Sequence, residues 1–329
     1  TTDRAKREQM FNDYASRGAN GNEYDNRELI VKMMKLRIEK ANLLGYENPA
    51  QMILVDKMAA NPEAVDTFLA GIMKQAVAKA EKEIVAMQAV MDEDIKSGLL
   101  PEGSVIEPWD WAYYAEKVRK AKYQLDEAAV SQYLSLDNVR SGMFYLANRL
   151  YGITFRPISA PKYHPECSVY EVLDVDDSHL GVLYIDPHPR KSKSGGAWCG
   201  YFTEQRYEDG KRVAPVVGIV CNFTPPVGDT PSLLSFDEAE TMFHEFGHAL
   251  HFLFADVRYR GLAEVEGDFV ELPSQIMENW AFEPEIMKVY ATHHSTGDVI
   301  PDNLIEKIQK ASLFNQGFIT TELAAAALI

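Results

Sequence analysis

The sequence predicts a mainly α-helical protein that contains one small antiparallel β region. Residues 1–152 carry apolar side chains at helical spacing and several helix-capping signals, whereas residues 153–226 carry short β-branched and aromatic runs between turn formers. Helical spacing resumes over residues 227–329, where one capped helix contains two histidines. These observations divide the chain into a helical region, a small β-sheet region and a second helical region with a candidate metal site.

Composition and charge narrow the classes of function. The 329 residues include 33 Lys and Arg against 49 Asp and Glu, which gives a net charge of −16. Nucleic acids and anionic membranes attract basic surfaces, so we expect neither as a partner. The three cysteines are too few for a disulfide framework and favour a reducing compartment. We therefore expect a cytoplasmic protein, and the periplasm stays open because the native N-terminus is not visible.

Capping signals place the helices of the first region. The segment Asn26–Leu44 has apolar residues at helical spacing and is followed by Gly45, a residue type common at helix C-termini. The pairs Asn48-Pro49 and Asn61-Pro62 each combine an N-cap residue with proline at the first helical position. The second pair predicts a long helix to about Ser97, because the run is rich in strong helix formers.

The middle region predicts a small sheet of hairpins. Five runs have strand character: ITFRPI, SVYEVLDV, LGVLYID, AWCGYF and PVVGIVCNF. Turn formers separate them, which favours antiparallel neighbours joined by hairpins. The connection HPRKSKSGG carries Arg190, Lys191 and Lys193, and we expect these cations to be solvated on a loop.

The segment FDEAETMFHEFGHALHFLF contains the candidate metal-binding and catalytic residues. Ser235 and Glu238 form a capping-box pattern before an apolar run, which predicts a helix. On that helix His244 and His248 lie about 40° apart in azimuth and about 6 Å apart along the axis. Two imidazoles in this arrangement can bind one Zn²⁺. Glu245 follows the first histidine, and its carboxylate can take a proton from a metal-bound water.

A third protein ligand has to come from elsewhere in the chain. The extension with a third histidine is excluded, because Phe254 stands at the position where that histidine would be. The segment DFVELPSQIMENW predicts a helix capped by Asp268, with Glu271, Gln275 and Glu278 on one face. Glu271 is the favoured ligand and Glu278 remains the competing one. Gln275 is a candidate partner that holds a ligand by hydrogen bonding.

Several segments resemble the thimet oligopeptidase family of zinc peptidases, family M3. They are FHEFGHALH, GDFVELPSQIMENW, GGAWCG, LRIEKANLLGY and WDWAYYAEKVRKAKYQLD. The resemblance implies that His244, His248 and Glu271 bind one Zn²⁺ per chain and that Glu245 is the general base. It also implies a neurolysin-like zincin fold with two halves around a deep channel for short unstructured peptides. Within the family, the sequence is most similar to bacterial peptidyl-dipeptidases, which release C-terminal dipeptides.

The resemblance also implies a longer enzyme, of which this chain is the catalytic core, incomplete at both ends. We expect the chain to bind zinc but to have little peptidase activity, because the family's oxyanion-stabilising loop has no counterpart before Ile329. The full-length enzyme is expected to be a monomer, whereas exposed apolar surface lets this chain associate. Two alternatives stay open: an endo-oligopeptidase of the same family, and a non-catalytic helical binding module with a vestigial metal motif.

Overall fold

The computed structural model describes residues 1–123 and 126–329, which form two compact units. Unit 1 comprises Thr1–Leu125 and Lys310–Ile329, and unit 2 comprises Asp126–Gln309. The expected regions 1–152, 153–226 and 227–329 are divided by their type of secondary structure. The two units are instead defined by which residues contact one another, so unit 1 combines both ends of the chain. Gln124 and Leu125, near the end of the stretch WDWAYYAEKVRKAKYQLD, lie outside the described residues.

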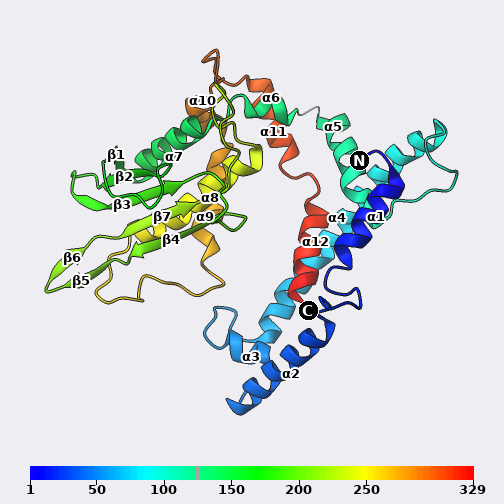
Figure 1. Cartoon of the computed structure of the whole chain (residues 1–329), viewed down its shortest axis with the longest axis horizontal. Coiled ribbons are helices and arrows are strands. Elements are labelled where there is room, and N and C mark those ends of the chain that lie inside the picture. The colour runs from blue at the N-terminus through cyan, green and yellow to red at the C-terminus, as the bar shows by residue number, and fades with distance from the viewer. Residues whose placement is uncertain (124–125) are drawn as a thin grey trace. The chain divides into compact units, whose positions relative to one another are not determined.

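Unit 1 is built from helices (Figure 1). They are α1 (Arg4–Ala15), α2 (Arg27–Leu43), α3 (Pro49–Leu54), α4 (Pro62–Lys96), the 3-10 turn η1 (Pro108–Asp110), α5 (Trp111–Tyr123) and α12 (Gln316–Ala327). The predicted N-caps are confirmed: the side chain of Asn48 accepts the Gln51 amide, and that of Asn61 accepts the Ala64 amide. The local signals of capping and helix propensity therefore set these helices correctly.

The C-terminal helix α12 packs along α4 within unit 1. A Cβ at Gly317 would come within 2.8 Å of the Lys79 carbonyl carbon, so only glycine permits this approach. The carboxylate of Glu83 accepts the amides of Gly317 and Phe318 at 3.1 and 3.0 Å. A side chain of α4 thereby satisfies the amides at the start of α12, where no residue of α12's own N-terminus makes a side-chain cap.

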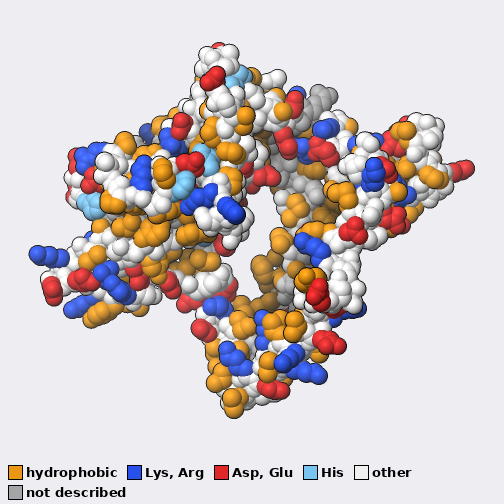
Figure 2. Space-filling view, in the orientation of Figure 1, with side chains coloured by type: hydrophobic (Ala, Val, Ile, Leu, Met, Phe, Trp, Pro, Cys, Tyr) orange, Lys and Arg blue, Asp and Glu red, His pale blue; other side chains and the backbone are white. Residues whose placement is uncertain are grey.

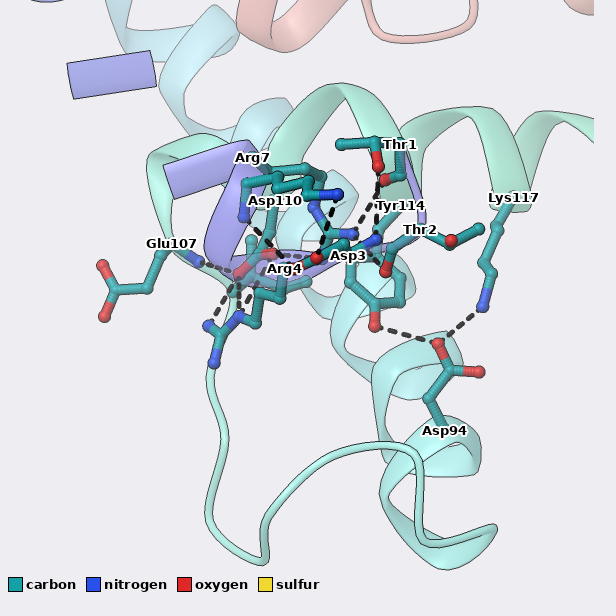
Figure 3. A network of polar contacts seen from close by, with 12 residues as sticks. Thr1, Thr2, Asp3, Arg4, Arg7, Asp94, Glu107, Asp110, Tyr114 and Lys117 are labelled. Atoms are coloured by element: carbon teal, nitrogen blue, oxygen red, sulfur yellow. Dashed lines mark hydrogen bonds and ion pairs between the residues drawn. The ribbon is translucent and has the colours of Figure 1, made fainter. Parts of the chain in front are cut away.

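A buried carboxylate joins α1 to the turn before α5 (Figure 3). Asp110 is 0% exposed, and its oxygens accept hydrogen bonds from Arg4 at 2.7 Å and Arg7 at 2.8 Å. Burial raises the pKa of Asp110, but the hydrogen bonds from Arg4, Arg7 and the Glu107 amide, together with the Arg4 charge, hold it below the ordinary value of 3.8. We call Asp110, Arg4 and Arg7 the arginine network; it fastens the N-terminal helix to the rest of unit 1.

Helix α2 is correctly predicted but exposes most of its apolar side chains. Its one buried residue is Ala41, and Figure 2 shows hydrophobic side chains among charged ones over α2 and α3. The exposed apolar residues of α2 are Leu29, Ile30, Val31, Met33, Met34, Leu36, Ile38 and Leu43. Within the described part of the chain, no helix has both the length and the apolarity that a membrane span requires.

Unit 2 contains a five-stranded sheet against which helices pack. The helices are α6 (Glu127–Ser131), α7 (Leu136–Tyr151), α8 (Phe236–Leu253), α9 (Glu271–Ala281), α10 (Pro284–Tyr290) and α11 (Asp302–Ala311), the last of which runs into unit 1. The strands are β1 (Thr154–Pro157), β2 (Ser168–Leu173), β3 (His179–Asp186), β4 (Trp198–Thr203) and β7 (Val216–Val220). The strands β5 (Arg206–Glu208) and β6 (Lys211–Val213) form a separate hairpin.

The sheet is mixed, which corrects the predicted antiparallel arrangement. Its strand order is β1-β2-β3-β7-β4, and β7 pairs with β3 in parallel, Leu183 lying opposite Val217. The other three pairs are antiparallel, as expected for hairpins. The parallel pair joins strands far apart in sequence, so no turn signal announces it. Helix α8 contacts β3, β4 and β7, and its Phe243 and Phe246 are fully buried.

The loop after β3 also departs from the prediction. Asp186 is 0% exposed and pairs with Arg190 at 2.7 Å and Lys193 at 3.3 Å. The Lys193 amine also donates to the carbonyl oxygens of His188 and Cys221. The expectation of solvated cations is therefore wrong for Lys193, because a buried carboxylate at the end of β3 draws the loop inward.

Candidate active site

The two histidines lie on α8, whose start is fixed by the predicted capping box. The Ser235 hydroxyl accepts the Glu238 amide at 3.1 Å, and the Glu238 carboxylate accepts the Ser235 amide at 2.8 Å. The same carboxylate accepts the Thr224 amide, which ties the helix to the segment that follows β7. The start of α8 is thus anchored, which sets the positions of His244, Glu245 and His248 between about two and a half and three and a half turns later.

Helix α9 approaches α8 at a glycine. A Cβ at Gly247 would overlap the Pro273 carbonyl oxygen and lie 2.5 Å from the Ser274 Cα, so a larger residue would separate the two helices. The helix begins at Glu271 with Val270 as its N-cap, so the prediction of Asp268 as the cap is wrong. Pro273 lies within the first turn, where its missing amide costs no helical hydrogen bond. The close crossing brings Glu271 to the two histidines.

His244, His248 and Glu271 form a compact group of metal-binding atoms. Glu271 Oε2 lies 3.2 Å from His244 Nε2 and 3.2 Å from His248 Nε2. The three ligand atoms lie within 4.8 Å of one another. Bonds of about 2.0–2.1 Å to a tetrahedral Zn²⁺ place ligand atoms about 3.3 Å apart. The donor set and spacing therefore fit Zn²⁺, with one coordination position left for water or substrate.

Two side chains of α9 hold these ligands in place. The Ser274 hydroxyl donates to Glu271 Oε2 at 2.7 Å, and Ser274 is itself buried. Glu278 Oε1 lies 2.5 Å from His244 Nδ1, the ring nitrogen that does not face Glu271. Sequence reasoning considered Glu278 only as a competing ligand and overlooked Ser274. The sequence did offer a signal for both residues: Ser274 and Glu278 follow the ligand Glu271 by three and seven residues, which places them on the same side of the helix.

The predicted partner Gln275 does not join this group. Its side chain is exposed, and among the described residues no hydrogen bond from that side chain to a histidine or to Glu271 is seen. His251 also stays outside, because its Nε2 lies 2.9 Å from the Ala263 carbonyl oxygen. The hydrogen bond to Ala263 agrees with the interpretation of His251 as a residue outside the ligand set.

Glu245, which follows the ligand His244 on α8, lies in a buried setting. It is 5% exposed, and its Oε2 has no hydrogen-bond partner among the described residues. Burial raises the pKa of Glu245 to about 7, opposed by His244 and reinforced by the charge of Glu271. A buried oxygen without a partner is costly and marks a position where a water or substrate group completes the site.

Two of the ligands have shifted pKa values. Burial lowers the pKa of His248, which favours the neutral ring that a metal requires. For Glu271, burial raises the pKa, but hydrogen bonding from Ser274 and the nearby histidines leave it below its ordinary value. Both shifts favour the protonation state in which His248 and Glu271 can bind a metal.

Comparison with known proteins identifies the family. Residues 1–329 match the family model described as Peptidase family M3. The chain belongs to peptidase family M3. Among relatives, it is 41% identical over 331 residues to the dipeptidyl carboxypeptidase of Escherichia coli, an alignment that covers 99% of this chain and 47% of that protein. The family membership confirms the predicted resemblance.

Two further relatives set the breadth of the match. The M3 chain is 36% identical to oligopeptidase A of Salmonella typhimurium over 97% of its length and 48% of that protein. It is 32% identical to saccharolysin of Saccharomyces cerevisiae over 90% of its length and 43% of that protein. The chain spans about half the length of the curated relatives it matches. The similarity therefore supports a metallopeptidase.

Proposed function

We propose that this chain forms the zinc-binding catalytic part of a peptidase that hydrolyses short unstructured peptides. The observation that carries the proposal is the convergence of His244, His248 and Glu271 beside a buried Glu245 whose Oε2 lacks a partner. Membership of family M3 supports the same activity. We further propose a cytoplasmic location, which fits three cysteines that are all unpaired.

The proposed roles follow from where each group lies. Zinc, when bound, polarises the scissile carbonyl and makes a bound water acidic. His244, His248 and Glu271 hold the metal at the crossing of α8 and α9. Glu245 takes the proton from the water and delivers it to the leaving amine. Among residues 1–123 and 126–329, no hydrogen bond competes for its buried Oε2.

For the substrate, we propose that dipeptides are released from free peptide C-termini. The relative that is 41% identical bears the name dipeptidyl carboxypeptidase, which favours this mode. Oligopeptidase A, at 36% identity, keeps internal cleavage as the second candidate. Mass spectrometry of products from matched peptides with free and amidated C-termini separates the two. Dipeptides released only from free C-termini support the first mode, and internal cuts in both peptides contradict it.

Metal dependence tests the peptidase proposal itself. A protein containing this chain is treated with chelator and then titrated with Zn²⁺, and peptide hydrolysis is followed. Activity that disappears and returns at one zinc per chain supports the proposal. For the 329-residue chain alone we propose one bound zinc with little hydrolysis, since it spans about half the length of its relatives. A chain that binds no zinc would favour the non-catalytic helical module.

A further inference from the structure

Helix α9 carries more than the third ligand. Glu271, Ser274 and Glu278 stand at positions i, i+3 and i+7, so all three lie toward one side of the helix. Glu271 reaches both histidine Nε2 atoms, and Ser274 holds Glu271. Glu278 alone reaches the far nitrogen of His244, Nδ1, at 2.5 Å.

The two nitrogens of His244 face different carboxylates. Nε2 lies 3.2 Å from Glu271 Oε2 on the side of the ligand group, whereas Nδ1 lies against Glu278. A neutral imidazole carries one proton, and the carboxylate that makes the shorter hydrogen-bond contact, Glu278 at 2.5 Å against 3.2 Å for Glu271, draws that proton to its own nitrogen. The proton then sits on Nδ1, and Nε2 keeps the lone pair that a metal needs.

We propose that Glu278 is a positioning residue that fixes the tautomer and orientation of His244 for zinc binding. The proposal rests on the zinc site proposed above. Glu278 is excluded as a fourth ligand of the same ion, because it contacts the ring nitrogen opposite to the one that faces Glu271 and His248. A carboxylate that accepts the second ring proton of a ligand typically changes metal affinity by about 10–100-fold when it is removed.

Zinc affinity of the 329-residue chain tests this role. Competition with a chromogenic chelator is measured for the wild-type chain, Glu278→Gln, Glu278→Asp and Gln275→Ala. We expect Glu278→Gln to bind zinc about 10–100-fold more weakly, because its amide can donate to Nδ1 and select the wrong tautomer. The shorter carboxylate of Glu278→Asp should recover part of the loss. Gln275→Ala, which changes an exposed side chain one turn earlier on α9, should match the wild type.

The tautomer itself gives a readout that a merely structural role would not change. In the zinc-free chain, ¹⁵N chemical shifts of the neutral His244 ring are expected to show the proton on Nδ1. In Glu278→Gln we expect a substantial population with the proton on Nε2, at unchanged far-UV circular dichroism. Equal tautomers and equal zinc affinity in the two proteins would overturn the positioning role. A wild-type chain that binds no zinc would instead overturn the proposed function.

Discussion

Two buried carboxylates, one in each unit, have pKa values shifted in opposite directions. Asp110 in unit 1 is 0% exposed and is paired with two guanidinium groups, which lower its pKa. Glu245 in unit 2 is 5% exposed, has one oxygen without a hydrogen-bond partner in the described part of the chain, and has its pKa raised by burial to about 7. Burial alone would raise the pKa of both, so the difference comes from their partners.

The contrast separates a structural carboxylate from a candidate catalytic one. Asp110 accepts hydrogen bonds from Arg4 and Arg7 of α1, and its charge thereby links α1 to the turn before α5. Glu245 retains an unpartnered oxygen beside a group that fits zinc. Removing Asp110 should therefore cost stability and leave zinc binding alone, whereas changing Glu245 should cost catalysis and leave stability alone.

The largest expected effect is on turnover in Glu245→Gln. In any preparation that hydrolyses peptides, we expect kcat to fall by about 10²–10⁴-fold, because a general base is lost while the shape of the side chain is kept. Zinc content should stay at one per chain. Glu285→Gln, which changes an exposed carboxylate on α10, is the matched control. Undiminished turnover in Glu245→Gln would remove Glu245 from the mechanism.

The next effect is on stability in Asp110→Asn. The substitution leaves two guanidinium groups without their counter-charge, and we expect the free energy of unfolding to fall by about 3 kcal/mol. Glu93→Gln breaks an exposed ion pair with Lys96 and should cost under about 1 kcal/mol. Urea unfolding followed by circular dichroism measures both. If the two variants lost equal stability, Asp110 would not be the fastening residue of α1.

A smaller effect is expected from Gly247→Ala, which tests the helix crossing. The added Cβ would overlap Pro273 and Ser274, while alanine favours the helix by about 1 kcal/mol. We therefore expect a net loss of about 1–2 kcal/mol in stability together with weaker zinc binding, because α9 carries Glu271. Chelator competition and urea unfolding measure the two effects. Wild-type zinc affinity at an intact fold would show that the crossing does not position Glu271.

The smallest effect is a pH dependence of unit 1. The pKa of Asp110 in the folded protein is below its ordinary value of 3.8, so its stabilising contribution is complete above that value. The contribution is lost as pH falls below 3.8 towards the folded pKa. Protection factors from amide hydrogen exchange in α1, which correct for the intrinsic pH dependence of exchange, should fall more between pH 5 and pH 3 in the wild type than in Asp110→Asn. An equal fall in both proteins would assign the acid sensitivity to other groups.

Local signals predicted the helix starts well, and they failed where segments far apart in the sequence meet. Asn48, Asn61 and Ser235 cap helices as predicted, because a cap involves residues within one turn. The parallel pairing of β3 with β7 and the hydrogen bond from Lys193 to the Cys221 carbonyl oxygen join segments about thirty residues apart and leave no local pattern.

In the candidate site, too, the features within one helix were predictable, whereas the contacts between helices were not. His244 and His248 share one helix, so their spacing could be read directly from the sequence. Glu271, Gln275 and Glu278 also share a helix face, but the spacing does not say which of them meets His244 Nδ1. Because α9 crosses α8 at Gly247, Glu278 is the residue that contacts His244 Nδ1. That crossing depends on packing between helices, which the spacing within one helix does not reveal.

Zinc content of two variants of the 329-residue chain tests the central claim most directly. The claim is that His248 holds the metal whereas the neighbouring Glu245 serves only as a base. Metal analysis after dialysis should find one zinc per chain in the wild type and in Glu245→Gln, and almost none in His248→Ala. Zinc retained in His248→Ala, or lost in Glu245→Gln at an intact fold, would contradict the assignment.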